Sequence, residues 1–213
     1  MKTKSTLIST VLCLLPLILS ALLYRQLPEQ VAIHFNSAGA PDSYVPKAVA
    51  AFVLPVLLAA VNVYLHFRVT QDPKVENASV SLRTLTMWIV PALSLIINPI
   101  TLFMALGRRI PIGMIAAAMA GLLIITAGNY MPKCKRNYTI GIKLPWTLDS
   151  EENWNHTHRF SGFLWVAGGL VMTINAFFQL PYVSTGIVAC LLVLPFVYSY
   201  LFYRRNGRNT GRG

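Results

Sequence analysis

Long apolar stretches alternate with short polar segments along the whole chain. A transmembrane α-helix needs about 20 predominantly apolar residues to cross the hydrocarbon core of a bilayer. Six stretches reach about that length, at residues 6–24, 47–67, 83–106, 110–128, 160–179 and 183–203. We therefore predict an all-α integral membrane protein, a six-transmembrane-helix bundle with a short ordered outer loop and an ordered cytoplasmic loop.

The charge distribution agrees with this architecture and predicts an orientation. The chain is 55% hydrophobic and 12% charged, and none of its seven acidic residues falls inside a predicted span. With both termini in the cytoplasm, 14 of the 18 lysines and arginines lie inside and four lie outside. This asymmetry follows the positive-inside rule, so we predict an N-in, C-in topology. It also accounts for the net charge of +11 without a direct nucleic-acid partner.

The fourth span carries small residues at every fourth position, namely Gly113, Ala117 and Gly121, and Ala116 and Ala120 widen this face. Such a face lets two helix backbones approach closely. We expect it to pack inside the bundle. A seam between two copies of the chain is the alternative.

A few polar side chains lie in or near the spans. Asn98 is deep inside an apolar stretch, so its amide should face the bundle and form hydrogen bonds. A substrate path is the alternative, but no intramembrane carboxylate accompanies this residue. Asn62, His66, Asn175 and Gln179 lie near span ends, where we expect them to meet headgroups or water.

Residues 27–47 form the predicted outer loop. The alternating, partly β-branched residues 31–35 predict a short strand. Turn-forming residues follow it directly, and they are Asn36, Gly39, Pro41 and Asp42. We expect a compact hairpin that caps the outer end of the bundle. A recognition surface for an extracellular partner is the alternative.

Residues 128–159, between the fourth and fifth spans, form the longest polar segment that reads as ordered. Asn137 and Gly141 permit tight turns, and Pro145 favours an extended residue before it. Ser150 is a natural N-cap for a helix with an acidic first turn, and this helix should run straight into the fifth span.

The same segment contains residue types that suit a membrane surface. Trp146 and Trp154 combine an apolar body with an N–H group for the headgroup zone. Lys133, Lys135 and Arg136 could hold a phosphate, although a basic cluster beside a membrane more often binds anionic lipid headgroups.

No catalytic constellation is visible. His156 and His158 are two residues apart, whereas a zinc-binding helix needs i, i+4 spacing. No serine lies in a nucleophile elbow. Cys13, Cys134 and Cys190 lie in two spans and the predicted cytoplasmic loop, so we expect packing roles and no disulfide. We predict no enzyme activity, no cofactor and no metal.

Two segments resemble known families. The outer loop is similar to the DUF1648 module at Leu27, Pro28, Val31, His34, Phe35, Asn36, Gly39, Asp42 and Lys47. The inner segment resembles the SdpI family of bacterial immunity proteins at Gly128, Asn129, Pro132, Lys133, Lys135, Asn137, Gly141, Ile142, Lys143, Pro145, Trp146, Thr147, Leu148, Trp154, Thr157, His158 and Arg159. Lys143 stands where many members have Arg, and Arg136 stands where Pro is common.

The resemblance implies a division of the chain. Residues 1–67 are expected to form a DUF1648-like module of two transmembrane helices and the outer loop. Residues 83–203 are expected to form an SdpI-like membrane domain of four helices, and residues 204–213 a basic cytoplasmic tail.

The resemblance further implies a multi-pass protein of the bacterial cytoplasmic membrane that protects the cell against a secreted toxin attacking that membrane. Some members also hold a cognate repressor at the membrane, which implies signal transduction. The expected partners are thus a secreted peptide or protein toxin, a cytoplasmic winged-helix repressor and membrane lipids. A small-solute transporter, a membrane enzyme and a purely structural bundle are the alternatives. The absence of ionisable residues within the spans argues against the first two.

The candidate partner-binding or structural residues are the polar, glycine, proline and tryptophan positions of the two motifs. They are His34, Asn36, Gly39, Asp42, Asn129, Pro132, Lys133, Lys135, Asn137, Gly141, Lys143, Pro145, Trp146, Trp154, His158 and Arg159.

Overall fold

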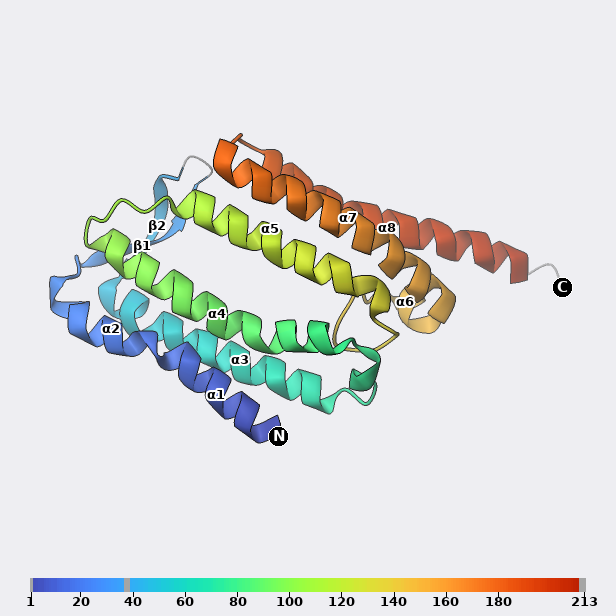
Figure 1. Cartoon of the computed structure of the whole chain (residues 1–213), viewed down its shortest axis with the longest axis horizontal. Helices are drawn as coiled ribbons and strands as arrows, with labels where there is room; N and C mark the ends of the chain where they lie inside the picture. Colours follow the sequence, from blue (N-terminus) through green and yellow to red (C-terminus); the bar gives the residue numbers. More distant parts are fainter. Residues whose placement is uncertain (1, 37–38, 211–213) are drawn as a thin grey trace. The chain divides into compact units, whose positions relative to one another are not determined.

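Helices make up most of the chain. The computed structural model describes residues 2–36 and 39–210. Its α-helices are α1 (Lys2–Leu14), α2 (Pro16–Leu23), α3 (Leu54–Gln71), α4 (Val80–Ala105), α5 (Ile112–Tyr130), α6 (Pro145–Asp149), α7 (Glu151–Phe178) and α8 (Val183–Thr210) (Figure 1). The shorter elements are the 3₁₀ turns η1 (Tyr24–Gln26), η3 (Val75–Asn77) and η4 (Met131–Lys133), the π-helix η2 (Val49–Val53), and the strands β1 (Gln30–Phe35) and β2 (Pro41–Pro46).

Six helical segments of the described chain are long and apolar enough to cross a membrane, the same number as the sequence predicts. They are Lys4–Gln26, Val49–Gln71, Val80–Ala105, Ile112–Lys133, Glu151–Phe178 and Val183–Asn206. The fifth segment runs unbroken from Glu151, as expected for a helix that begins in the polar segment and continues into the apolar span.

The chain divides into two compact units. The first contains Met1–Thr70 and Thr84–Gly113, and the second contains Gln71–Arg83 and Met114–Gly213. Each unit has its own clusters of buried apolar side chains. One cluster of the first unit joins three helices through Cys13 of α1, Ala59 of α3 and Val90 of α4.

Prolines set the local breaks in the first unit. Pro16 stands at the first turn of α2, where its missing N–H is not needed, and it separates α1 from α2. The π-helix η2 precedes Pro55, and the Leu54 N–H bonds to the carbonyl of Val49 five residues earlier. Since Pro55 has no N–H to donate, the regular i→i−4 ladder cannot continue through it.

Polar side chains inside the first unit bond to one another. Asn62 and His66 of α3 are buried, which corrects the expectation that they meet headgroups or water. The Asn62 amide donates to Ser9 Oγ on α1 at 2.9 Å, and the His66 ring bonds to the Asn62 carbonyl at 3.0 Å. Asn98 is buried and donates to Ser94 Oγ at 2.9 Å, so its predicted hydrogen bonding is confirmed, within its own helix.

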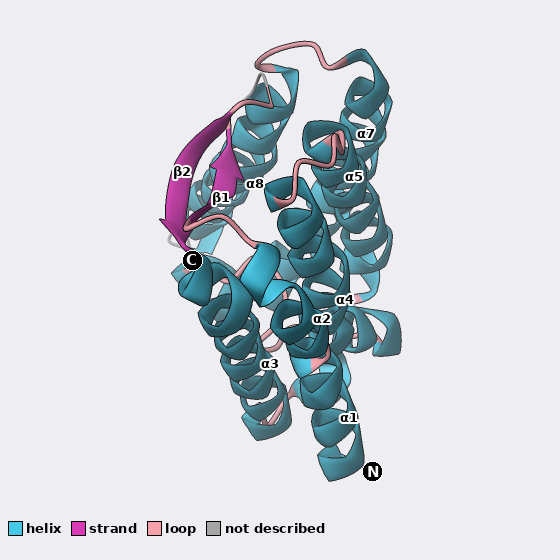
Figure 2. Ribbon diagram, turned by 90° about the vertical axis from the view of Figure 1, so that its left-hand side faces the viewer, coloured by secondary structure: helices cyan, strands magenta, loops and turns pink. Residues whose placement is uncertain are grey.

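Between the first two spans, β1 and β2 form an antiparallel hairpin, whose two strands are the only ones in the described residues (Figure 2). The predicted strand at 31–35 is confirmed. Pro41 and Asp42 lie in β2 rather than in the turn, which corrects their assignment. The register shifts on both sides of His34, as expected for β-bulges.

In the second unit, α5 and α7 run side by side and touch through their backbones at glycine pairs (Figure 1). A Cβ on Gly121 would lie 2.8 Å from the carbonyl oxygen of Gly169, and one on Gly128 would lie 3.0 Å from that of Gly162. The predicted close-packing face is therefore confirmed at Gly121. It continues at Gly128, seven residues on, whereas Gly113 belongs to the first unit.

Helices α7 and α8 pack through aromatic and polar contacts. Phe160 stacks on Tyr198 with ring centroids 4.4 Å apart. Asn175 is buried at their connection, where its Oδ1 accepts from the Leu180 N–H at 3.1 Å, so it does not face headgroups or water as expected. Gln179 is exposed there. Cys190 is exposed on α8, so its expected packing role is wrong, whereas Cys13 and Cys134 are buried.

The glycine contact predicts the effect of a bulky substitution. Gly121→Leu should lower the thermal unfolding temperature in detergent, because the new side chain would meet the Gly169 carbonyl and the Thr173 side chain. Overpacking of this kind typically costs about 1–3 kcal/mol. Gly186→Leu on α8 is the control, since nothing lies within 4 Å of its Cβ position. Equal stability of the two variants would show that α5 and α7 do not pack in this way.

The predicted membrane orientation can be tested by cysteine labelling. The test needs one exposed position in the outer loop and one in the inner loop. Ser37 of the outer loop lies outside the described residues, and Ser150 of the inner loop caps a helix. We therefore choose Ser43 on β2 and Asp149 at the end of α6. Both are exposed. In a background without the three native cysteines, Ser43→Cys should react with an impermeant thiol reagent in intact cells, and Asp149→Cys should react only after permeabilisation. The reverse pattern would invert the topology.

Candidate functional site

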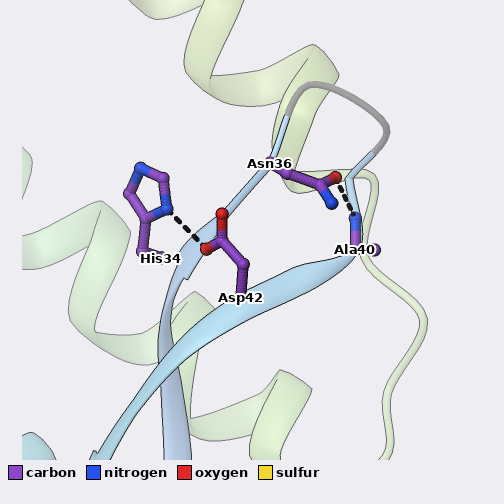
Figure 3. Close-up of polar contacts among 4 residues, drawn as sticks. All are labelled: His34, Asn36, Ala40 and Asp42. Carbon is purple, nitrogen blue, oxygen red and sulfur yellow. Dashed lines mark hydrogen bonds and ion pairs between the residues drawn. The ribbon is translucent and has the colours of Figure 1, made fainter.

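Four residues of the DUF1648 motif lie at the turn end of the hairpin. The His34 Nδ1–H donates to Asp42 Oδ1 at 2.6 Å, and the Ala40 N–H donates to Asn36 Oδ1 at 3.0 Å (Figure 3). Gly39 has φ +75°, a left-handed conformation that glycine adopts without strain. The bulges that flank His34 account for its pairing with Asp42, because a bulge changes the direction of side chains along a strand.

The His34–Asp42 pair is open to solvent, with side-chain exposures of 69% and 41%. With Nδ1 donating to the carboxylate, the imidazole Nε2 is free to accept a hydrogen bond from an external group. The base of the hairpin is held differently. Lys47 bonds to Glu29 at 2.9 Å and lies over the ring of Tyr24, and the hydrogen bond to Glu29 raises the Lys47 pKa.

Asn137 organises the segment between α5 and α6. It is fully buried, and its Oδ1 accepts from the N–H groups of Thr139 at 3.0 Å and Ile140 at 2.7 Å. Its amide nitrogen donates to the carbonyl oxygens of Lys135 at 3.0 Å and Ile140 at 2.9 Å, and also contacts Cys134 Sγ at 3.2 Å. The Asn137 side chain thus supplies the hydrogen bonds that water would otherwise make to the backbone of this turn. This agrees with its predicted role in a tight turn.

The segment between α5 and α6 packs against Trp154 and His158 of α7. Trp154 is fully buried, and its indole N–H donates to the Cys134 carbonyl at 2.6 Å, so its predicted place at the membrane interface is wrong. His158 stacks on Trp154 and accepts the Ile142 N–H at Nε2, at 3.0 Å. A Cβ at Gly141, whose φ is +123°, would lie 2.5 Å from His158 Nε2, so only glycine fits there.

Helix α6 is a single capped turn. Leu144 is extended before Pro145, as predicted. Thr147 Oγ1 accepts the Leu144 N–H at 2.9 Å at one end of the helix. Arg136 donates to the carbonyls of Leu148 and Asp149 at the other end, at 3.0 and 2.9 Å. Arg136 is thus used within the fold.

Ser150 then caps α7 by accepting the Asn153 N–H at 3.2 Å, which confirms the predicted N-cap.

Residues before α4 also hold this segment, and sequence reasoning missed them. Asp72 is buried and accepts the Lys74 N–H at 2.8 Å and the Tyr138 N–H at 3.0 Å. Asn77 donates to the Arg136 carbonyl at 2.7 Å. Asp72 precedes a proline, and Asp-Pro is a turn signal that could have identified its local role. The link to Tyr138, 66 residues away, has no local signal.

A second buried network joins α6, α7 and α8. The Trp146 indole donates to Ser199 Oγ at 2.7 Å, and Ser199 donates to Asn153 Oδ1 at 3.0 Å. Thr157 donates to the same oxygen at 2.9 Å. The Trp146 ring also contacts three aromatic rings of α8, those of Phe196, Tyr200 and Tyr203. Trp146 therefore fixes α6 to α8.

Comparison with known proteins agrees with both motifs. Residues 133–199 match the SdpI/YfhL protein family, and residues 11–59 match the domain of unknown function DUF1648. Immunity protein SdpI of Bacillus subtilis (strain 168) is 28% identical over 205 residues, which cover 95% of this chain and 97% of that protein. The chain therefore resembles the SdpI family in its second half and an SdpI immunity protein along nearly its whole length. No solved structure matches it.

The structure separates the SdpI motif residues into two groups. Asn137, Trp154 and His158 are buried and bond to backbone groups, Gly141 fits against the last two, and Trp146 is half-buried against α8. Pro145 begins α6, and Pro132 packs on Gly162. The polar residues that remain exposed are Asn129, Lys133, Lys135, Lys143 and Arg159. The first group builds the segment, and the second group is available for contacts with other molecules.

The hydrogen bonds of Asn137 predict a large loss of stability on its truncation. Asn137→Ala leaves buried N–H and carbonyl groups unpaired, which should cost about 3 kcal/mol in total. Thermal unfolding in detergent measures this loss. Asn129→Ala is the matched control, because Asn129 is exposed in the same motif and its loss should change stability by about 0.5 kcal/mol or less.

The thiol of Cys134 provides a second readout for the same variants. Burial raises its pKa, so the native protein holds the unreactive thiol form. In a background with Cys13 and Cys190 replaced by serine, maleimide labelling of Cys134 should therefore require denaturant in the parent and in Asn129→Ala, and should proceed without denaturant in Asn137→Ala. Equal protection in all three proteins would show that Asn137 does not hold the segment together.

Proposed function

We propose that this protein is an immunity protein of the bacterial cytoplasmic membrane, which protects the cell by binding a secreted, membrane-active toxin. The observation that carries this proposal is the similarity to an immunity protein along 95% of the chain, which includes both motif segments. The alternatives, a small-solute transporter and a membrane enzyme, have less support, because no acidic side chain lies inside the six apolar stretches predicted from the sequence to serve as a transport or catalytic group.

The exposed part of the hairpin is the proposed toxin-recognition surface. Its lower part is structural, since Leu27 and Val31 are buried. Its turn end presents His34 with a free Nε2, held in one tautomer by Asp42, and the ring of Tyr44, two residues after Asp42 on β2, is also exposed. A fixed acceptor and an exposed aromatic ring on one hairpin are suited to bind a peptide that offers an N–H group and an apolar side chain.

The proposed division of labour follows the two modules. Residues 1–67 would receive the toxin through the hairpin. Residues 83–203 would form the membrane domain, with 204–213 as a basic tail on the cytoplasmic side. A cytoplasmic winged-helix repressor held at this domain would add signal transduction to immunity. The exposed ring of Tyr138, with Lys74 5.1 Å from its centroid, offers such a partner a contact surface on the second unit.

Expression in a toxin-sensitive host tests the proposal. The parent should raise survival against a secreted peptide encoded beside its own gene. His34→Ala and Asp42→Asn should reduce toxin binding by roughly 30-fold each, as expected for an anchor worth about 2 kcal/mol. Glu29→Gln is the control, since Glu29 belongs to the same hairpin but lies at its base. Protection is measured as the toxin dose that halves growth, with membrane abundance checked by immunoblot.

Two results would count against this function. If the parent gives no protection against any such peptide, the immunity proposal fails and the transporter and enzyme alternatives gain. If the parent protects and the hairpin variants protect equally well, immunity stands but the hairpin is only a cap.

A further inference from the structure

Three exposed cations of the second unit have no carboxylate within ion-pair distance among the described residues. The Lys47–Glu29 ion pair and the His34–Asp42 hydrogen bond both lie in the hairpin of the first unit. Lys133, Lys135 and Arg159 are exposed in the SdpI motif, and no carboxylate lies within ion-pair distance of them. Lys133 lies over the ring of Tyr130, with Nζ 5.4 Å from the centroid, which leaves its ammonium open to an anion.

The backbone contact between α5 and α7 brings these residues to one end of the helix pair. Gly128 meets Gly162, and Pro132 packs directly on Gly162, so η4 lies against α7 at this level. Arg159 precedes Gly162 by three residues, which is just under one helical turn. The end of α5, the turn η4 and the Arg159 turn of α7 therefore meet at one level.

Helix geometry also places Asn129 and Arg159 on one side of the α5–α7 pair. Each residue advances by about 100° around a helix, so Asn129 lies about 100° on from Gly128, and Arg159 lies about 60° on from the direction of Gly162. The two helices are antiparallel and face each other. Rotations of the same sense, each viewed along its own chain from N- to C-terminus, therefore turn both side chains toward the same side of the pair. Asn129 and Arg159 thus flank one groove of the α5–α7 pair.

This level coincides with the edge of the apolar spans. The candidate span that contains α5 ends at Lys133, and the apolar part of α7 begins after Arg159. Cations at such an edge meet the phosphate groups of lipids, and anionic headgroups attract them most. Two of the carboxylates of this unit bond elsewhere. Asp72 bonds to backbone N–H groups, and Glu152 accepts from Asn206 on α8.

We propose that Asn129, Lys133 and Arg159, together with Lys135 two residues beyond η4, form a binding site for the phosphate of an anionic phospholipid headgroup. Arg159 would bind two phosphate oxygens through its planar guanidinium, the lysines would add charge, and the Asn129 amide would donate to a further oxygen. Such a lipid would stabilise the α5–α7 pair where the polar segment begins. This site is independent of the toxin-binding proposal.

Lipid titration of the full-length protein in detergent micelles tests the site. The probes are dioleoylphosphatidylglycerol, dioleoylphosphatidylcholine and inorganic phosphate, and the readouts are the thermal unfolding temperature and lipid adducts in native mass spectrometry. Phosphatidylglycerol should bind the parent and raise its unfolding temperature. Phosphatidylcholine and inorganic phosphate should have little effect, because only the first probe combines negative charge with acyl chains.

A matched pair of triple variants then assigns the site. Lys133→Gln, Lys135→Gln and Arg159→Gln together should weaken phosphatidylglycerol binding by roughly fivefold per cation removed. Lys143→Gln, Arg204→Gln and Arg205→Gln together remove the same charge from other exposed positions of the second unit and should leave binding near the parent value.

Three results would overturn the proposal. Equal losses in the two triple variants would show a diffuse charge effect rather than a site. An equal response to inorganic phosphate would show a free-anion site. The absence of any preference for phosphatidylglycerol in the parent would show that the cations serve another partner.

Discussion

The contact between α5 and α7 at two glycine pairs is the constraint on which the second unit depends. Helices usually pack with their axes 8–10 Å apart, and glycine permits the closest approach. At Gly121–Gly169 and Gly128–Gly162 the two backbones touch, which fixes both the separation of the helices and their register along the axis. Close backbone packing matters more in a membrane than in water, because lipid provides no hydrophobic force that drives helices together.

That register determines how the polar segment can fold. It sets Pro132 on Gly162, so the chain leaves α5 directly beside the turn of α7 that carries Trp154 and His158. The following residues must then satisfy their backbone groups in a space where Trp154 excludes water. They do so with side chains, since the Trp154 indole binds the Cys134 carbonyl and His158 accepts the Ile142 N–H. A shift of α5 by one residue would separate these donors from their acceptors.

Local chemistry made several of these features predictable from sequence. Ser150 was recognisable as a cap, Leu144 as extended and Gly121 as a contact residue, because each depends on its neighbours in the chain. Trp154 was assigned wrongly for the opposite reason. A tryptophan next to an apolar span fits the membrane interface and a buried wall equally well, and only the packing of α5 against α7 decides between them. Buried polar pairs of the first unit join different helices. Asn62 and Ser9, for example, are 53 residues apart in the chain, and the local sequence around either residue does not identify its partner.

The division of the SdpI motif into buried and exposed residues bears on how the family signature relates to function. Asn137, Gly141, Trp154 and His158 are explained by the backbone groups that they bond or contact, so they require no partner. Lys133, Lys135 and Arg159 make no comparable contact, and solvation would serve such exposed cations at any position of the surface. Cations on this side of the spans already follow from the positive-inside rule, and their position at one level of the α5–α7 pair is what the proposed phosphate site would use. The exposed half of the motif is therefore explained by what surrounds the chain, whereas the buried half is explained by its fold.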